Sequence, residues 1–230
     1  NGSELNLNTS IKKIEVKNGQ VKGITLTNGE FVSSNCVIIT FPAYLAINQL
    51  FDNDVFDQKF VESTNRLNKT TSVIEVHFAL SEKIDSRQVV FPVGKDYVCK
   101  GIFFISNITP SVSPPDEHLM IVGTPVSPDD AKNSQKIAEV VTKMKEELSS
   151  IYPKFQQALL WDRPKAWSLV ESVVKEPGLV WKNKMPHEVS QVKGLFFVGD
   201  STVSYGIGTD SAAHSSILCH PKIISYLKNT

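Results

Sequence analysis

An apolar strand that ends at Gly-Asp and leads through a short loop into a helix constrains this sequence more than any other feature. The strand covers residues 195–198, Gly199 and Asp200 follow it, and a helix is predicted over 208–227. Glycine lets a backbone approach a ligand closely, and the first turn of a helix presents unpaired N–H groups at the positive end of its dipole. Ligands of open α/β sheets bind beyond the carboxyl ends of strands. The pattern therefore predicts an anion-binding loop over 198–213.

Two carboxylates and a glycine pair in this region have competing interpretations. Asp200, at the tip of the strand, is placed to accept hydrogen bonds from the hydroxyl groups of a ribose or ribityl chain. Asp210 taken alone is more often a helix-start carboxylate that binds no ligand. Gly206-Ile207-Gly208 begins like a GxGxxG fingerprint, but position 211 is serine and the segment does not follow the first strand of a βαβ unit. We therefore reject a dinucleotide fingerprint here.

The first forty residues predict a hairpin followed by a strand of another kind. Residues 11–16 and 21–27 alternate between apolar and polar side chains, and Asn18-Gly19 between them is a strong hairpin signal. Residues 36–40 form a continuous apolar run before Phe41-Pro42, as expected for a strand that is buried on both faces of a parallel sheet. No earlier strand could pair with it in parallel, so we expect missing sequence upstream.

The middle of the chain predicts a region of strands and helices. Apolar positions recur at helical spacing over 43–66 and 128–151, and strand patterns cover 71–80, 88–92, 102–106 and 119–124. The segment 154–193 has no clear assignment. Its three tryptophans are Trp161, Trp167 and Trp181. They either line a ligand cavity or anchor a long surface segment on the core. The predicted class is α+β, with an antiparallel sheet and helices in the middle and part of an α/β domain at the two ends.

Composition excludes several classes of function. Lys plus Arg equals Asp plus Glu, at 24 each, so no overall field favours nucleic acid. Cys36, Cys99 and Cys219 form no metal-binding or disulfide pattern, and we expect reduced thiols and no metal. No apolar run reaches the ~20 residues of a membrane span. We expect a cytoplasmic protein, with peripheral membrane contact and the oligomeric state left open.

Both ends of the chain resemble one family. The segment from Gly194 to Ala213 resembles the C-terminal FAD motif of flavoprotein amine oxidases, protoporphyrinogen oxidases and phytoene desaturase-like proteins. Asn8-Thr9-Ser10-Ile11, Val21-Lys22-Gly23-Ile24 and the run from Val37 to Pro42 resemble the flap and strand that precede the substrate domain in that group. The resemblance implies that residues 1–42 and 190–230 belong to an FAD-binding domain and residues 43–189 to a substrate-binding domain.

The resemblance also implies a set of cofactor contacts. The backbone of Ile11 would contact the adenine, Thr40 would lie near the cofactor, and Gly199 and Asp200 would meet the pyrophosphate and ribityl chain. Backbone N–H groups near the pyrimidine side of the flavin would come from Gly208, Thr209 and Asp210. Donors at this edge stabilise the negative charge of reduced flavin. The family's glycine-rich strand–turn–helix is absent from these 230 residues, so we expect an inactive fragment of an FAD-dependent oxidoreductase that does not retain FAD.

The catalytic residues cannot be identified from the sequence. His77 lies in an apolar strand and Tyr205 in the loop before the helix, and both are candidates for contact with a small organic substrate. A hydrogen-bonded wall residue is the ordinary role for such a histidine, and Tyr205 could equally cover the loop. The expected reaction is desaturase-like or amine-oxidase-like transfer of a hydride or two electrons to flavin. The alternatives are a non-catalytic α+β module that binds another anion or a protein partner, and, ranked last, an NAD enzyme.

Overall fold

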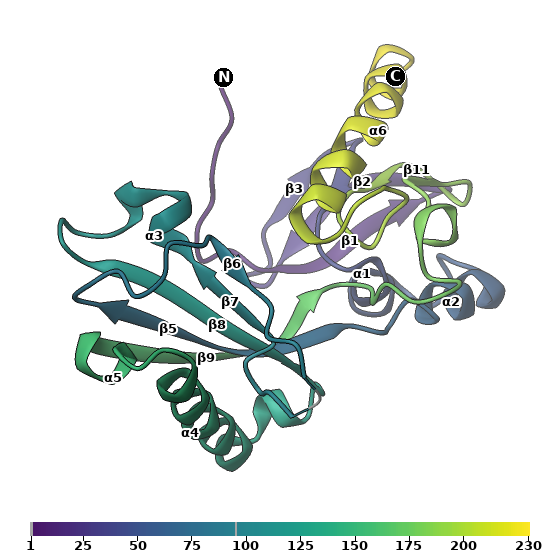
Figure 1. Ribbon diagram of the computed structural model, residues 1–230. Coiled ribbons are helices and arrows are strands. Elements are labelled where there is room, and N and C mark those ends of the chain that lie inside the picture. The colour runs from purple at the N-terminus through teal and green to yellow at the C-terminus, as the bar shows by residue number, and fades with distance from the viewer. Residues whose placement is uncertain (1, 95) are drawn as a thin grey trace. The chain divides into compact units, whose positions relative to one another are not determined.

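The computed structural model describes residues 2–94 and 96–230, which form two compact units (Figure 1). The first unit comprises the chain up to Lys69 together with Glu171–Thr230, and the second comprises Thr70–Val170. Both helices and strands occur in each unit, so the predicted α+β class is confirmed. The boundaries differ from the predicted domain limits at 42 and 190. The assignment of the units to cofactor and substrate stays a prediction.

The first unit is built around a mixed six-stranded sheet with the order β1-β2-β11-β10, in which β3 also pairs with β2 and β4 with β11. Its elements are β1 (Ile11–Lys17), β2 (Gln20–Leu26), β3 (Phe31–Ser33), β4 (Val37–Ile39), α1 (Ala43–Gln49), α2 (Gln58–Asn65), the 3-10 turn η3 (Trp181–Asn183), β10 (Glu188–Val189), β11 (Val192–Phe197) and α6 (Gly208–Lys228). The predicted hairpin is present, because β1 and β2 pair antiparallel around Asn18 and Gly19. Both turn residues have positive φ, at 54° and 67°, which is the conformation that favours Asn-Gly in such turns.

The apolar run at 36–40 finds its parallel partner later in the same chain. In β4, Val37, Ile38 and Ile39 lie opposite Leu195, Phe196 and Phe197 of β11. The expectation of burial on both faces was wrong for the centre of this strand, where Ile38 is 45% exposed. The pairing nevertheless brings the ends of two parallel strands together, which places the start of the Gly-Asp loop beside residue 40.

The segment 43–66 contains two helices, not the single helix that its periodicity predicts. Helix α2 starts anew because the Asp57 carboxylate accepts a hydrogen bond from the backbone N–H of Phe60 at 2.8 Å, an ordinary N-cap interaction. Helix α1 buries Ala43, Tyr44 and Ile47 in the core of the first unit. This packing explains why the first unit extends beyond residue 42.

The second unit is a five-stranded sheet, with the order β6-β7-β8-β5-β9, that α4 covers on one face (Figure 1). Four of its strands pair antiparallel, as predicted. Its elements are β5 (Thr71–Leu80), β6 (Val89–Val90), β7 (Gly101–Phe104), α3 (Ile105–Ile108), η1 (Pro110–Val112), β8 (His118–Val126), η2 (Asp130–Lys132), α4 (Ser134–Ile151), α5 (Phe155–Ala158) and β9 (Leu159–Glu171). The core forms where Met144 and Leu148 of α4 pack with Ile74, Val76 and Phe78 of β5.

One sequence expectation for the second unit needs correction, and one segment without an assignment proves to be a strand. The long helix starts at Ser134 and not near Pro128, because the Asn133 side chain accepts a hydrogen bond from the N–H of Lys136. Residues 159–171, which showed no clear pattern, form the longest strand of the molecule, β9. This strand lies at the edge of the sheet, and its residues are exposed or half-buried without a regular alternation.

Candidate functional site

The loop over 198–207, between β11 and α6, begins at the paired ends of β4 and β11. The N–H of Val198 donates to the carbonyl oxygen of Ile39 at 2.8 Å. Gly199 has φ +137°, and a Cβ added there would lie 3.4 Å from the carbonyl oxygen of Thr40. Two of the predicted cofactor residues, Thr40 and Gly199, are therefore adjacent, although they are far apart in the sequence.

The first half of the loop is buried on a cluster of hydroxyl groups. Ser204 and Ser211 share a hydrogen bond of 2.7 Å between their Oγ atoms, and Thr202 Oγ1 donates to the carbonyl oxygen of Gly199 at 2.7 Å. Ser215 Oγ accepts from the N–H of Gly199 at 3.0 Å. These four hydroxyl-bearing residues are all at most 2% exposed. They fix the loop to the first turns of α6, which makes its geometry rigid.

A buried lysine completes this cluster. Lys184 is 4% exposed, and its Nζ donates to the carbonyl oxygen of Asp200 at 2.9 Å, to Ser204 Oγ at 2.7 Å and to Ser211 Oγ at 2.9 Å. Burial, together with the charge of Lys175, lowers the pKa of Lys184 from 10.5 to about 8. Sequence reasoning missed this residue because it lies in the segment that showed no periodic pattern.

The second half of the loop faces solvent. Tyr205 is 59% exposed and Ile207 is 62% exposed, and Gly206 and Gly208 both have positive φ. Helix α6 begins at Gly208, and within the described chain no side chain caps this end. The N–H groups of its first turn therefore remain available to a ligand at the positive end of a 21-residue helix.

The structure also places four further predicted residues of the first unit. The carboxylate of Asp200 accepts hydrogen bonds from the backbone N–H of Ser172, at 2.7 Å, and from its hydroxyl group. A carboxylate has about four acceptor positions, so the predicted contact with a sugar chain stays a prediction. Thr209 and Asp210 are exposed in the first turn of α6. Ile11 begins β1, two strands away from β11 in the sheet order.

The two substrate candidates lie in different units. His77, on β5, has Nε2 3.2 Å from Glu75 Oε1, and the same oxygen accepts from Trp167 Nε1 at 3.0 Å. Tyr205 stacks on Trp181 with ring centroids 3.5 Å apart and an interplanar angle of 7°. Both residues thus have a structural partner, and their contact with a substrate stays a prediction.

The described residues contain neither a metal-binding cluster nor a membrane-spanning helix. Across residues 2–94 and 96–230, no group of three His, Cys, Asp or Glu side chains is placed to hold a metal ion. In that part of the chain no helix has the length and apolarity needed to cross a bilayer. The three cysteines are free thiols, with Cys99 and Cys219 buried and Cys36 half-buried.

Comparison with solved structures shows the fold of the chain. An oxidoreductase from Methanosarcina mazei matches with a TM-score of 0.74 and 19% identity, over 93% of this chain and 49% of that one. A protein from Pyrococcus furiosus matches with a TM-score of 0.63 and 17% identity, over 94% and 46%. A putrescine oxidase variant matches with a TM-score of 0.64 and 12% identity, over 97% and 49%. The chain spans about half the length of each of these proteins.

Comparison with families is more specific. No curated protein matches the chain significantly. The model of the flavin containing amine oxidoreductases matches residues 1–219, which is nearly the whole chain and includes the loop and the start of α6. The predicted family is thereby confirmed: the chain belongs to the flavin containing amine oxidoreductases.

Proposed function

We propose that this chain supplies the flavin-contacting loop of an FAD-dependent oxidoreductase. The observation that carries the proposal is the start of α6, which no side chain of the described residues caps. A buried cluster of hydroxyl groups holds the loop before it in place. The chain also belongs to a flavin-containing family. The residues present fit one edge of a flavin, because the glycines at 206 and 208 leave room for close approach. The exposed apolar faces of Tyr205 and Ile207 suit contact with a flat ring.

When bound, FAD supplies the acceptor for a hydride or an electron pair. In this proposal the N–H groups of Gly208, Thr209 and Asp210 would hold one edge of the flavin ring, and donors there would stabilise negative charge on it. The Asp200 carboxylate orients a hydroxyl of the ribityl chain while Ser172 holds it in place. Tyr205 and Ile207 exclude water from the same edge.

We propose an organic substrate of apolar character and a desaturase-like reaction, with amine oxidation as the second candidate. In this proposal Tyr205 of the first unit contacts the substrate, and His77 is a separate candidate within the second unit.

The test is a titration with FAD that compares two variants carrying the same charge change. Ile207→Glu places a carboxylate where the flavin edge would bind, and the positive end of the helix dipole tolerates that charge. Ile217→Glu is the control, because Ile217 is also exposed, at 67%, on the same helix. FAD fluorescence and a dissociation constant are measured for the chain up to roughly 1 mM FAD, and for the protein encoded by the complete gene.

We expect Ile207→Glu to weaken FAD binding about tenfold or more, which is about 1.4 kcal/mol, while Ile217→Glu leaves it unchanged. The loss should be larger for reduced flavin, because its negative charge lies nearest the new carboxylate. Equal affinity of the two variants would contradict the proposed site. If the protein from the complete gene binds phosphate at this loop but no FAD, the non-catalytic module is the better description.

A further inference from the structure

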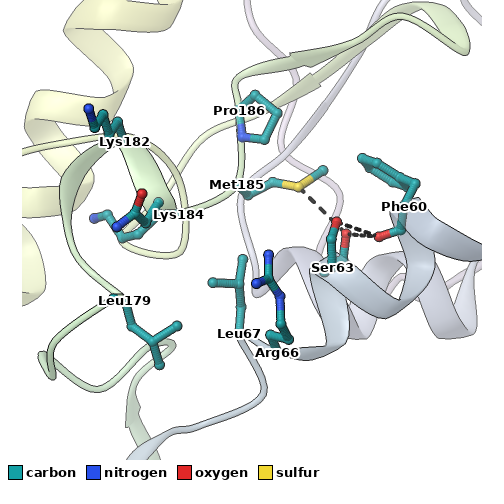
Figure 2. Close-up of a pocket in the computed structure, with 12 residues that line it drawn as sticks. Phe60, Ser63, Arg66, Leu67, Leu179, Lys182, Lys184, Met185 and Pro186 are labelled. Carbon is teal, nitrogen blue, oxygen red and sulfur yellow. Dashed lines mark hydrogen bonds between the residues drawn. The ribbon is translucent and has the colours of Figure 1, made fainter.

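A cavity in the first unit has the lining of an anion-binding site. It has a volume of about 480 Å³ and lies between α2 and the segment 178–186 (Figure 2). This volume is within the range of small-molecule sites, about 300–1,000 Å³. Its lining residues belong to the first unit alone and include none of the residues assigned above to flavin contact.

Both sides of the cavity contribute apolar side chains to its lining. Phe60 and Leu67 come from the α2 side, and Leu179, Met185 and Pro186 come from the facing segment (Figure 2). Leu67 is 4% exposed and Met185 is 2% exposed, so these two side chains are fixed by packing. The apolar surface that a ligand can reach is therefore offered mainly by Phe60, Leu179 and Pro186, which are exposed or half-buried.

The charges of the cavity are all positive. Arg66, Lys182 and Lys184 line it, and no carboxylate does so among the residues that the structure describes. Lys184 is already committed to the loop through its three hydrogen bonds. Across the described ranges, Arg66 and Lys182 form no ion pair. Figure 2 shows the guanidinium of Arg66 projecting toward Met185, so this group is available to a ligand.

The surroundings of Arg66 favour a singly charged ligand. Arg66 is the C-cap residue of α2, where the negative end of the helix dipole disfavours every negative charge, so a ligand with a single charge is opposed least. A planar guanidinium matches a carboxylate with two parallel hydrogen bonds. We propose that this cavity binds an aliphatic monocarboxylate, with its carboxylate on Arg66 and its chain against Phe60, Leu179 and Pro186. This inference is independent of the proposed flavin contact.

The proposal is tested by calorimetric titration of the whole chain with octanoate. Acetate lacks the apolar body and 1-octanol lacks the charge, so both should bind at least about tenfold more weakly than octanoate. Arg66→Gln should weaken octanoate binding about tenfold or more and should leave 1-octanol unaffected. The matched control is Lys59→Gln, which removes one positive charge from the same helix outside the cavity.

Arg66→Lys serves as the second variant, because it keeps the charge but loses the two-bonded geometry and should show an intermediate loss. Circular dichroism of each variant establishes that it is folded. Octanoate binding that is equal in Arg66→Gln and Lys59→Gln would overturn the proposal, as would equal affinity for octanoate and 1-octanol. Added FAD should not change octanoate affinity, so failure of this proposal is distinguishable from failure of the flavin proposal.

Discussion

Replacing Lys184 by Met should change how the stability of the first unit depends on pH. The pKa of Lys184 is about 8 in the folded chain, against a reference value of 10.5, chiefly because the side chain is buried. The folded state therefore binds the proton less tightly than the unfolded state does. The charged form of Lys184 lowers the stability of the folded state below pH 8, and this loss disappears as pH rises from about 8 to 10.5.

The size of the effect follows from these two values. The full difference of about 2.5 pKa units corresponds to about 3 kcal/mol, and the part recovered between pH 7 and pH 9.5 is about 2 kcal/mol. Lys184→Met removes the titrating group, although it also removes three hydrogen bonds. The unfolding free energy of the unchanged protein should thus rise by about 2 kcal/mol more than that of Lys184→Met over this interval.

The assay is urea unfolding at several pH values, followed by fluorescence. Trp161→Phe and Trp167→Phe are introduced into both proteins, so that Trp181 of the first unit is the only tryptophan that reports. Other groups that titrate between pH 7 and 9.5 affect both proteins and cancel in the difference. Parallel pH profiles for the two proteins would refute the reasoning, because they would mean that Lys184 titrates at its ordinary pKa.

Two further changes should act on stability through mechanisms visible in the structure. Arg87 lowers the pKa of Asp85 to about 2, so Asp85→Asn should destabilise the second unit by about 1 kcal/mol at pH 6, with solvent screening of the exposed Arg87 taken into account. This difference should vanish as pH falls through about 2 in urea unfolding. Gly194→Ala should cost about 2–4 kcal/mol, because φ is +80° and its Cβ would lie 2.2 Å from the carbonyl oxygen of Asn35. Gly29→Ala is the comparison, because φ is +90° and an added Cβ would have no atom within 4 Å. It should cost only about 1–2 kcal/mol. Equal costs for the two substitutions would show that the close contact at Gly194 is relieved.

Local signals in the sequence predicted local structure well. Asn18-Gly19 predicted the hairpin because only a few residue types adopt positive φ readily, and the strand before Gly199 predicted the loop and the helix after it. The break between α1 and α2 was missed because the helical spacing of apolar residues continues across it. The new helix begins where the side chain of Asp57 caps its first turn. Lys184 was missed because its burial depends on Ser204 and Ser211, which are distant in the sequence.

The loop between β11 and α6 combines two roles that require different chemistry. Its first half uses buried hydroxyl groups and a lysine, which tie the backbone of Asp200 and Ser204 to α6. In its second half, Ile207 is exposed, and no side chain of the described residues caps the first N–H groups of α6. Donors stabilise developing charge best when they need no rearrangement during the reaction. The buried half therefore keeps the exposed half in a fixed position, and Lys184 contributes to this through its three hydrogen bonds, although the desolvation of its charge costs stability.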